Sequence, residues 1–315
     1  MGEEYSGYLG EPGFAAGVEM PRSDGGLVRH MDEADLERIL DLRTVVRWSA
    51  DPEAFGLLRG TRDARWAVAE AGDEARSIVG MVGAVPLGPI GVLCHLAVHD
   101  AYRRVGLGAC LTRWAVAYLR SRGAGLVRLD STAEAEGLYR SVGFEPALRR
   151  TAYRLEEAGT RRRVGSRGYE VSTLTMGDLP EVYGLDRWSF GGDRSAIVLA
   201  AIRLHPGSGL VARDGSGRIK GYLVRSVAGE EIRLGPFLAE NDEAAGTLLD
   251  AALGVTGEGG GPVEITSAAP PGAPEHGLLE EFGFAGAPDR LRMELGELPR
   301  EEGLLQYGTT AYLAT

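Results

Sequence analysis

The residues best suited to chemistry in this chain form a short run of arginines and glycines, Arg103-Arg104-Val105-Gly106-Leu107-Gly108-Ala109. An apolar segment ending at Val98 precedes the run. Apolar residues at helical spacing follow it, namely Leu107, Leu111, Trp114, Ala115, Tyr118 and Leu119. A glycine loop that leads into a helix N-terminus presents free backbone N–H groups and the positive end of the helix dipole to an anion. The two arginines add positive charge, so the pattern predicts a cradle for a pyrophosphate.

The spacing of this loop separates it from two other phosphate-binding loops. The chain contains no Gly-x-x-x-x-Gly-Lys-[Ser/Thr] sequence, which a nucleoside-triphosphate loop requires. Gly106-Leu107-Gly108 is followed by Ala-Cys-Leu and therefore lacks the third glycine of a dinucleotide-binding loop. What remains is the pattern Arg-x-x-Gly-x-Gly, carried by Arg103, Gly106 and Gly108.

A second segment downstream, Ala135 to Phe144, reads Ala-Glu-Gly-Leu-Tyr-Arg-Ser-Val-Gly-Phe and predicts a short helix that ends at a glycine cap. Together the two segments resemble the acetyl-CoA-binding core of the GNAT acetyltransferase superfamily. That superfamily shows [Arg/Gln]-x-x-Gly-x-[Gly/Ala] after its fourth strand and Ala-x-x-Leu-Tyr-x-x-x-Gly-Phe after its fifth. The resemblance implies an α/β (α+β) fold, in which each GNAT domain is a mixed, mostly antiparallel sheet with splayed central strands flanked by helices.

The order of the expected elements is similar in the two halves of the chain. In the first half we expect a helix from Asp35 and strands at Gly26–Arg29, Trp66–Glu70, Ser77–Val85, Val92–Val98, Leu126–Asp130 and Leu148–Leu155. In the second half we expect strands at Gly168–Val171, Gly209–Arg213, Ile219–Val224, Glu231–Phe237 and Val263–Thr266. The interpretation is a tandem repeat with a flexible extension (1–25), a GNAT acetyl-CoA-binding catalytic domain (26–156), a linker (157–167) and a diverged GNAT-like domain without the cofactor motif (168–315).

The second half lacks the residues that the cradle needs. At the corresponding position stands Ala239-Glu240-Asn241-Asp242-Glu243-Ala244-Ala245-Gly246, whose three carboxylates would repel a pyrophosphate. Leu279 takes the place of Tyr139. The segments Phe190–Arg194 and Gly235–Glu240 resemble those of two-domain bacterial GNAT proteins. Within them, Asp193 and Arg194 either line a substrate cleft or form a structural ion pair with the helix that follows.

The resemblance also implies how the first domain would bind acetyl-CoA. The pantetheine arm of the cofactor would pair with the backbone edge of Leu96, Ala97 and Val98, and its pyrophosphate would lie on the loop. The implied cofactor-binding residues are Leu96, Ala97, Val98, Arg103, Arg104, Val105, Gly106, Leu107, Gly108, Ala109 and Tyr139. The N–H of Val98 is the implied donor to the oxyanion.

Three side chains are candidates for the proton transfers. Tyr139 is the candidate general acid, since a phenol stays protonated at neutral pH and can donate to a leaving thiolate; the alternative is a tyrosine that caps the core. His95 is a candidate base, or a ring turned toward the core. Asp130 either orients the amine or a water, or caps the start of the next helix.

Composition limits the partners of the protein. A formal net charge of −11 argues against a nucleic-acid partner and mildly favours a cationic substrate such as an amine. The chain has no apolar run of the roughly twenty residues that a bilayer crossing needs, so we expect no membrane partner and a cytoplasmic location. Cys94 and Cys110 are expected to be reduced core residues, and the five histidines lack ligand spacing, so no metal is expected. The sequence leaves open whether the protein forms a homodimer.

The expected function is that of an acetyl-CoA-dependent N-acetyltransferase. It would move an acetyl group to the primary amine of a small molecule by direct attack in a ternary complex. Two alternatives remain: a non-catalytic acyl-CoA-binding or sensing protein, and a protein N-acetyltransferase. The sequence does not name the acceptor amine.

Overall fold

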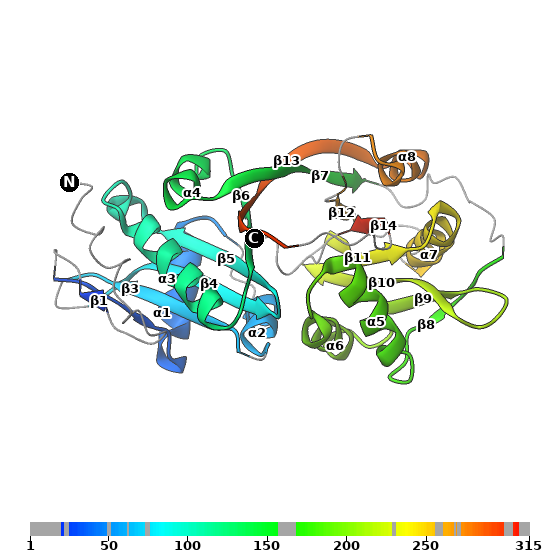
Figure 1. Ribbon diagram of the computed structural model, residues 1–315, viewed down its shortest axis with the longest axis horizontal. Helices are drawn as coiled ribbons and strands as arrows, with labels where there is room; N and C mark the ends of the chain where they lie inside the picture. Colours follow the sequence, from blue (N-terminus) through cyan, green and yellow to red (C-terminus); the bar gives the residue numbers. More distant parts are fainter. Residues whose placement is uncertain are drawn as a thin grey trace. The chain divides into compact units, whose positions relative to one another are not determined.

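The computed structural model describes residues 20–21, 25–48, 52–61, 63–72, 76–156, 168–228, 231–255, 261–267, 269, 272–298 and 305–308. The linker expected at 157–167 and most of the extension expected at 1–25 lie outside these residues. The chain separates into two compact units (Figure 1). The first contains the described residues up to Pro146 and Met293–Leu298. The second contains those of Ala147–Arg292 and the segment 305–308.

The sheet of the first unit follows the strand order β1-β2-β3-β4-β5-β6. The strands are β1 (Met20–Pro21), β2 (Leu27–His30), β3 (Arg65–Glu70), β4 (Ile78–Leu87), β5 (Ile90–Val98) and β6 (Leu126–Ser131). All neighbouring pairs are antiparallel except β5 and β6, which are parallel. β4 is buried at every position except Pro86. Its unbroken apolar sequence is typical of a central strand that is covered on both faces.

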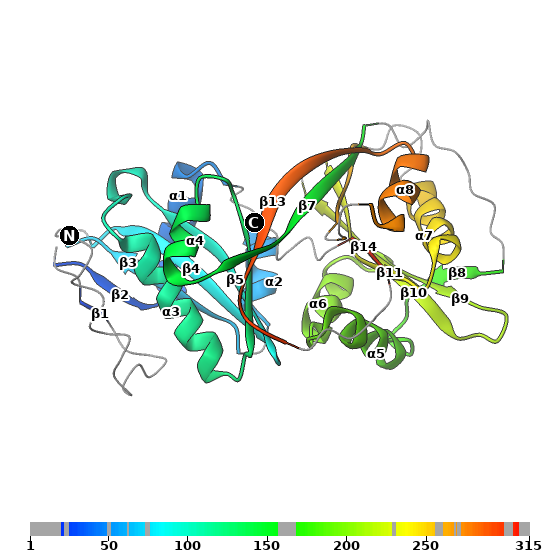
Figure 2. The same cartoon turned by 45° about the horizontal axis from the view of Figure 1, so that its top comes forward.

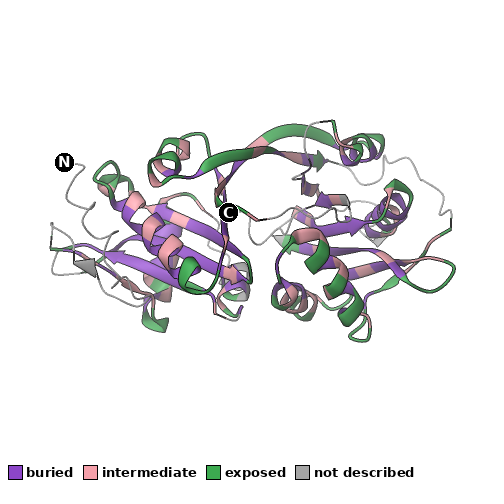
Figure 3. Ribbon diagram, in the orientation of Figure 1, coloured by how far each residue is buried: buried purple, intermediate pink, exposed green. Residues whose placement is uncertain are grey.

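Helices cover both faces of this sheet. They are η2 (Glu33–Asp35), α1 (Leu36–Val45), α2 (Pro52–Arg59), η3 (Asp100–Tyr102), α3 (Leu107–Ser121) and α4 (Glu136–Val142). Figure 1 shows α3 in front of the sheet and α1 behind it. The apolar stripe expected on α3 is the face that it buries, with Leu111, Ala115 and Leu119 fully covered. Figure 3 shows the same division, with buried residues toward the strands and exposed residues outside.

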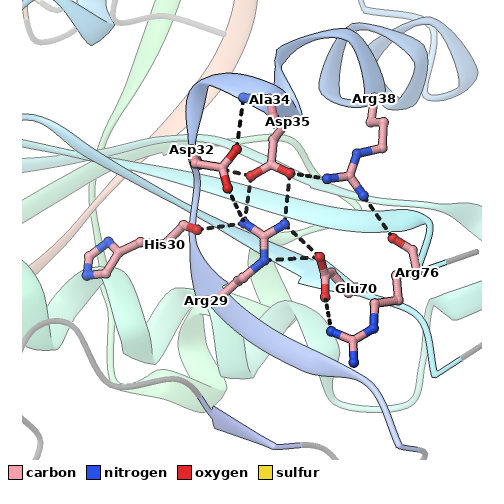
Figure 4. Close-up of polar contacts among 8 residues, drawn as sticks. All are labelled: Arg29, His30, Asp32, Ala34, Asp35, Arg38, Glu70 and Arg76. Atoms are coloured by element: carbon pink, nitrogen blue, oxygen red, sulfur yellow. Dashed lines mark hydrogen bonds and ion pairs between the residues drawn. The ribbon is translucent and has the colours of Figure 1, made fainter.

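A cluster of charges ties β2 and the helix η2 to β3 (Figure 4). Arg29 on β2 donates through Nη1 and Nη2 to the two carboxylate oxygens of Asp35, at 2.6 and 2.8 Å, and through Nε to Glu70 at 3.0 Å. Asp35 also accepts from the backbone N–H of Asp32, completing a capping box at the start of η2. Asp35 has no exposed surface, so this ion pair is an internal part of the fold.

The second unit repeats the plan of the first. Its sheet follows the order β7-β12-β11-β10-β9-β8, with β14 paired separately to β11. The strands are β7 (Glu145–Leu155), β8 (Glu170–Thr173), β9 (Gly209–Arg213), β10 (Ile219–Ala228), β11 (Glu231–Ala239), β12 (Val263–Ser267), β13 (Ala285–Gly296) and β14 (Leu305–Gly308). The helices are α5 (Leu179–Phe190), α6 (Ser195–Leu204), α7 (Asp242–Val255) and α8 (Pro274–Glu281). Figure 2 shows α7 and α8 on one side of β8–β11 and α5 and α6 on the other.

Two strands, β7 and β13, are each divided between the two units. β7 begins in the first unit, but its residues from Ala147 onward belong to the second, where Tyr153 pairs with Ile265 of β12. β13 begins in the second unit, and its residues from Met293 onward belong to the first. There, Glu294 accepts a hydrogen bond from Arg128 of β6 at 2.8 Å. The strand expected at Leu148–Leu155 is therefore present, but most of it completes the sheet of the second unit.

Within the described residues, no helix has the length and apolar character that a bilayer crossing requires. Cys94 and Cys110 are both buried, and neither is part of a disulfide.

Candidate active site

The edge of β5 that faces away from β4 carries, near Val98, backbone groups that pair with no other described strand. His99 N donates to Val79 O, which makes that residue pair a hydrogen-bonded one of the antiparallel ladder. The adjacent pair, Val98 and Gly80, is therefore a non-hydrogen-bonded pair, and the N–H and C=O of Val98 point away from β4. On that side β6 pairs with β5 only at Ile90–Val92. The expected splay of the central strands therefore begins before Val98.

A β-bulge sets the orientation of the edge of β5 at Val98. The register between β4 and β5 shifts between Met81 and Gly83, so His95 and Leu96 together oppose Val82. His95 has the left-handed φ of +55°, as one residue of a bulge often does. The bulge lies three residues before Val98 and changes the direction of the last residues of β5.

The loop after β5 ends at a helix N-terminus, as the sequence predicts. Residues 103–106 are exposed, and α3 begins at Leu107. Gly106 is the N-cap with φ +85°, a conformation that favours glycine. The N–H of Cys110 makes the first intrahelical bond, to Gly106 O. The N–H groups of Leu107, Gly108 and Ala109 precede that bond and belong to the first turn, whose donors have no partner within the helix.

Arg103 connects this loop to the edge of β5. Its Nε donates to Val98 O at 3.1 Å, and its Nη2 lies 2.8 Å from Asp100 Oδ1. Part of the positive charge expected in the cradle is thus balanced by Asp100. Arg104, with φ +66°, is exposed beside it.

The helix with the candidate acid packs against the same first turn. A side chain at Gly108 would meet Leu138 Cδ2 at 3.0 Å, so this glycine lets α4 approach α3 closely. Tyr139 of α4 is 6% exposed, and its ring meets Phe144 edge-on at 5.9 Å. Gly143 ends α4 in the left-handed conformation, and Phe144 N donates to Tyr139 O. This Schellman cap confirms the predicted glycine C-cap and fixes the position of Tyr139.

His95 is packed among residues of α1, α2 and β3. Its Nδ1 lies 3.1 Å from Arg43 Nη1, and Phe55 stacks on its ring at 5.5 Å. Because a guanidinium only donates, Nδ1 accepts, and the ring is neutral with its proton on Nε2. Both His95 and Arg43 are 3% exposed. Arg43 and Phe55 carry no motif that sequence reasoning could have used, since only the fold brings α1 and α2 to this strand. Asp130, at the end of β6, is half-buried.

The residues singled out in the second unit form a different kind of site. Arg194 donates through Nε and Nη2 to the carboxylate of Asp186 at 2.8–3.0 Å, and Tyr222 also donates to that carboxylate. All three are at most 2% exposed. Burial lowers the pKa of Arg194, but Asp186 and Tyr222 together raise it more, so the arginine stays charged. The ion pair is thus with the preceding helix α5, whereas the sequence suggested the helix that follows. Asp193 accepts from Ser195 N at 3.1 Å.

Comparison with known proteins agrees with this geometry. Residues 62–146 match a model of the acetyltransferase (GNAT) domain, and residues 182–302 match a second model of that description. The chain is 23% identical over 174 residues to the uncharacterized N-acetyltransferase YitH of Bacillus subtilis (strain 168), covering 55% of this chain and 59% of that protein. A putative acetyltransferase from Pyrococcus horikoshii has a similar fold, with a TM-score of 0.74, 21% identity, and coverage of 95% and 99% of the two chains. A tandem GNAT protein from the clavulanic acid biosynthesis pathway superimposes with a TM-score of 0.62 at 16% identity, over 88% and 100%.

The two matched domains together span more than half of the chain, and each has the mostly antiparallel sheet and flanking helices of the fold. The chain belongs to the GNAT acetyltransferase superfamily, as a two-domain member.

Proposed function

We propose that the first domain is an acetyl-CoA-dependent N-acetyltransferase that acts on the primary amine of a small molecule. The observation that carries this proposal is the edge of β5 at Val98, whose N–H and C=O point away from β4, beside the helix N-terminus at Gly106. Arg103 joins the two features through its hydrogen bond to Val98 O. The two features offer what acetyl-CoA needs, a strand edge for its amide-bearing arm and N–H donors for its pyrophosphate. Acetyl-CoA would supply an acetyl group on a thioester.

In this proposal each residue has a distinct task. The N–H of Val98 donates to the carbonyl oxygen that becomes negative as the amine attacks. The N–H groups of Leu107, Gly108 and Ala109 bind the pyrophosphate. The hydroxyl of Tyr139 donates a proton to the leaving thiolate. The neutral amine attacks the thioester carbon directly, with both substrates bound together, and the C–S bond breaks. The proton that the amine nitrogen loses passes to water, from which the Tyr139 phenolate is reprotonated.

We assign His95 a positioning role in place of the base that the sequence allowed. Its accepting nitrogen is already bonded to Arg43, so it is not available to take a proton from an amine. The ring instead holds the bulge that aims Val98. Asp130 stays the candidate that orients the amine or a water. Because His95 is enclosed and does not act as a base, the same packing fits a protein that binds acyl-CoA without turnover. Binding and turnover must therefore be measured separately.

The experiment is calorimetric titration of the full chain with acetyl-CoA, followed by thiol-release assays against a panel of amines. Gly106→Asp should abolish binding, because a carboxylate at the helix N-terminus repels phosphate. Gly123→Asp is the matched control: Gly123 is at the other end of α3 with φ +90° and open space around it, so backbone strain is similar. One acetyl-CoA-binding site together with thiol release in the presence of an amine supports an enzyme. One acetyl-CoA-binding site without thiol release supports a sensor. Binding that survives Gly106→Asp would remove the cradle from the proposal.

A further inference from the structure

The second domain contains a counterpart of the strand edge at Val98. Glu240 N donates to Lys220 O, just as His99 N donates to Val79 O in the first domain. Ala239 therefore corresponds to Val98, and its backbone N–H and C=O point away from β10. A register shift between Leu223 and Arg225 places Gly235 and Pro236 at a bulge, and β12 pairs with β11 only at Ile232 and Arg233. The bulge and splay of the first domain are thus repeated.

In the second domain this edge is occupied by the chain itself. β14 runs antiparallel to β11 and pairs Gly308 with Phe237, Gln306 with Leu238 and Leu305 with Ala239. A side chain at Gly308 would meet Leu234 O at 2.9 Å and Ile265 Cγ2 at 3.2 Å, so residue 308 fits between β11 and β12. Among the described residues of the first domain, no strand occupies the corresponding edge at Val98.

Tyr307 extends the contact of β14 to the helix that corresponds to α3. Its side chain is fully buried, with the ring 5.0 Å from that of Phe237. Its hydroxyl donates to Asp242 Oδ1 at 2.5 Å, at the first residue of α7. On the other side of the segment, Gln306 Nε2 donates to Ser189 O at 2.8 Å. Three consecutive residues of β14 therefore make specific contacts in the groove.

The helix N-terminus of the second domain is closed to an anion. Only Glu240 and Asn241 separate β11 from α7, whereas residues 99–106 separate β5 from α3. Asn241 Oδ1 accepts from Ala244 N at 2.9 Å, which satisfies a donor of the first turn. The Asp242 carboxylate next to it would repel a phosphate. The second domain thus repeats the bulge and the splayed strands of the first, but it lacks the charge pattern that suits a nucleotide.

We propose that the groove between β11 and β12 is a binding site for an extended peptide, and that its ligand is Leu305–Gly308 of the same chain. The segment uses the strand edge by β-augmentation. Its specificity comes from the absence of a side chain at Gly308, from the Tyr307 hydroxyl on Asp242 and from the Gln306 amide on Ser189. β14 lies along Ala239 as the pantetheine arm is proposed to lie along Val98, and this analogy rests on the proposed function of the first domain. The pairing of β14 with β11 does not depend on it.

The test is amide hydrogen exchange at Phe237 and Ala239 in the full chain. In Gly308→Val the new side chain collides with the backbone at Leu234, so exchange at both amides should accelerate by about tenfold or more. Gly215→Val is the matched control, because Gly215 lies in the turn between β9 and β10 with open space around it. Tyr307→Phe, a milder change, should accelerate exchange less than Gly308→Val.

A synthetic peptide of residues 303–310 supplies the ligand in trans. Added to the Gly308→Val protein, it should restore slow exchange at Phe237 and Ala239, whereas the same peptide carrying Gly308→Val should not. Unchanged exchange in Gly308→Val, no effect of the peptide, or protection of these amides by acetyl-CoA would each overturn the proposal. Failure of the proposed function would instead appear as absence of acetyl-CoA binding by the unaltered chain, with these exchange results intact.

Discussion

The Nε of Arg103 lies 3.1 Å from the carbonyl oxygen of Val98, so one side chain joins the loop before α3 to the edge of β5. The two halves of the candidate cofactor site are therefore held in a fixed relation by a hydrogen bond between them. The same guanidinium is paired with Asp100. We infer that Arg103 shapes the site as well as adding charge to it.

Arg103→Lys should weaken acetyl-CoA binding by about tenfold, since loss of one hydrogen bond to a charged group corresponds to about 1.5 kcal/mol. The unfolding midpoint should hardly change, because the ion pair with Asp100 is largely exposed. Calorimetric titration measures the affinity. Arg104→Lys makes the same change at the neighbouring exposed arginine, and equal effects of the two variants would contradict the special role of Arg103.

Tyr139→Phe should lower kcat by about a hundredfold or more, the usual contribution of a general acid. Acetyl-CoA affinity should stay nearly the same, because the ring that packs on Phe144 is kept. Steady-state kinetics with a good acceptor separates the two quantities. The matched control is Tyr118→Phe, which removes a hydroxyl that donates to Asp63 O in a structural role. Full turnover in Tyr139→Phe would take this residue out of the mechanism.

Cys94 should resist thiol reagents in the folded protein. Burial raises its pKa to about 12, although the charge of Arg43 opposes the shift, so almost no thiolate exists at pH 8. We expect no rapid alkylation of the native chain, and reaction of both cysteines in denaturant. Mass spectrometry after iodoacetamide treatment locates the modified residue. Cys94→Ser assigns any signal to Cys110, and rapid labelling of native Cys94 would contradict its enclosed position.

Asp35→Asn should destabilise the protein by about 3 kcal/mol at neutral pH, because it removes one partner of a buried ion pair. Burial acts to raise the pKa of Asp35, but hydrogen bonds from Arg29 and the Asp32 backbone hold it below its ordinary value. A lowered folded-state pKa means that this stabilisation is complete above the ordinary value and is lost as pH falls through the folded value. The difference in free energy of unfolding between the two proteins, measured in urea, should therefore shrink as the pH is lowered below the ordinary pKa of aspartate.

Asp32→Asn is the control for this experiment, since Asp32 is 65% exposed and an asparagine there can still cap η2. It should cost much less than Asp35→Asn. A pH-independent difference between Asp35→Asn and the unaltered protein would show that the charge of Asp35 is not what stabilises the fold.

Local features of the site could be predicted from the sequence because each depends on neighbouring residues. Gly106 marks the start of α3 and Gly143 the end of α4, since both need a left-handed backbone that glycine adopts at little cost. The apolar spacing from Leu107 to Leu119 predicts the buried face of α3. The role of the edge at Val98 was implied by the resemblance to the GNAT superfamily, whereas the bulge that orients it is seen only in the structure.

Contacts between distant residues were decided only by the tertiary structure. Arg43 and His95 are 52 positions apart, and neither has a motif that announces the other. The exchange of β7 and β13 between the units, and the pairing of β14 with β11, depend on which strand edges are free once both sheets have formed. A free strand edge exposes N–H and C=O groups, and pairing it with another strand satisfies them. The sequence by itself therefore determined the family motifs, the start of α3 and the end of α4, because these depend on neighbouring residues. The folded chain decided where strands such as β7 and β10 begin and end, and that β14 lies between β11 and β12.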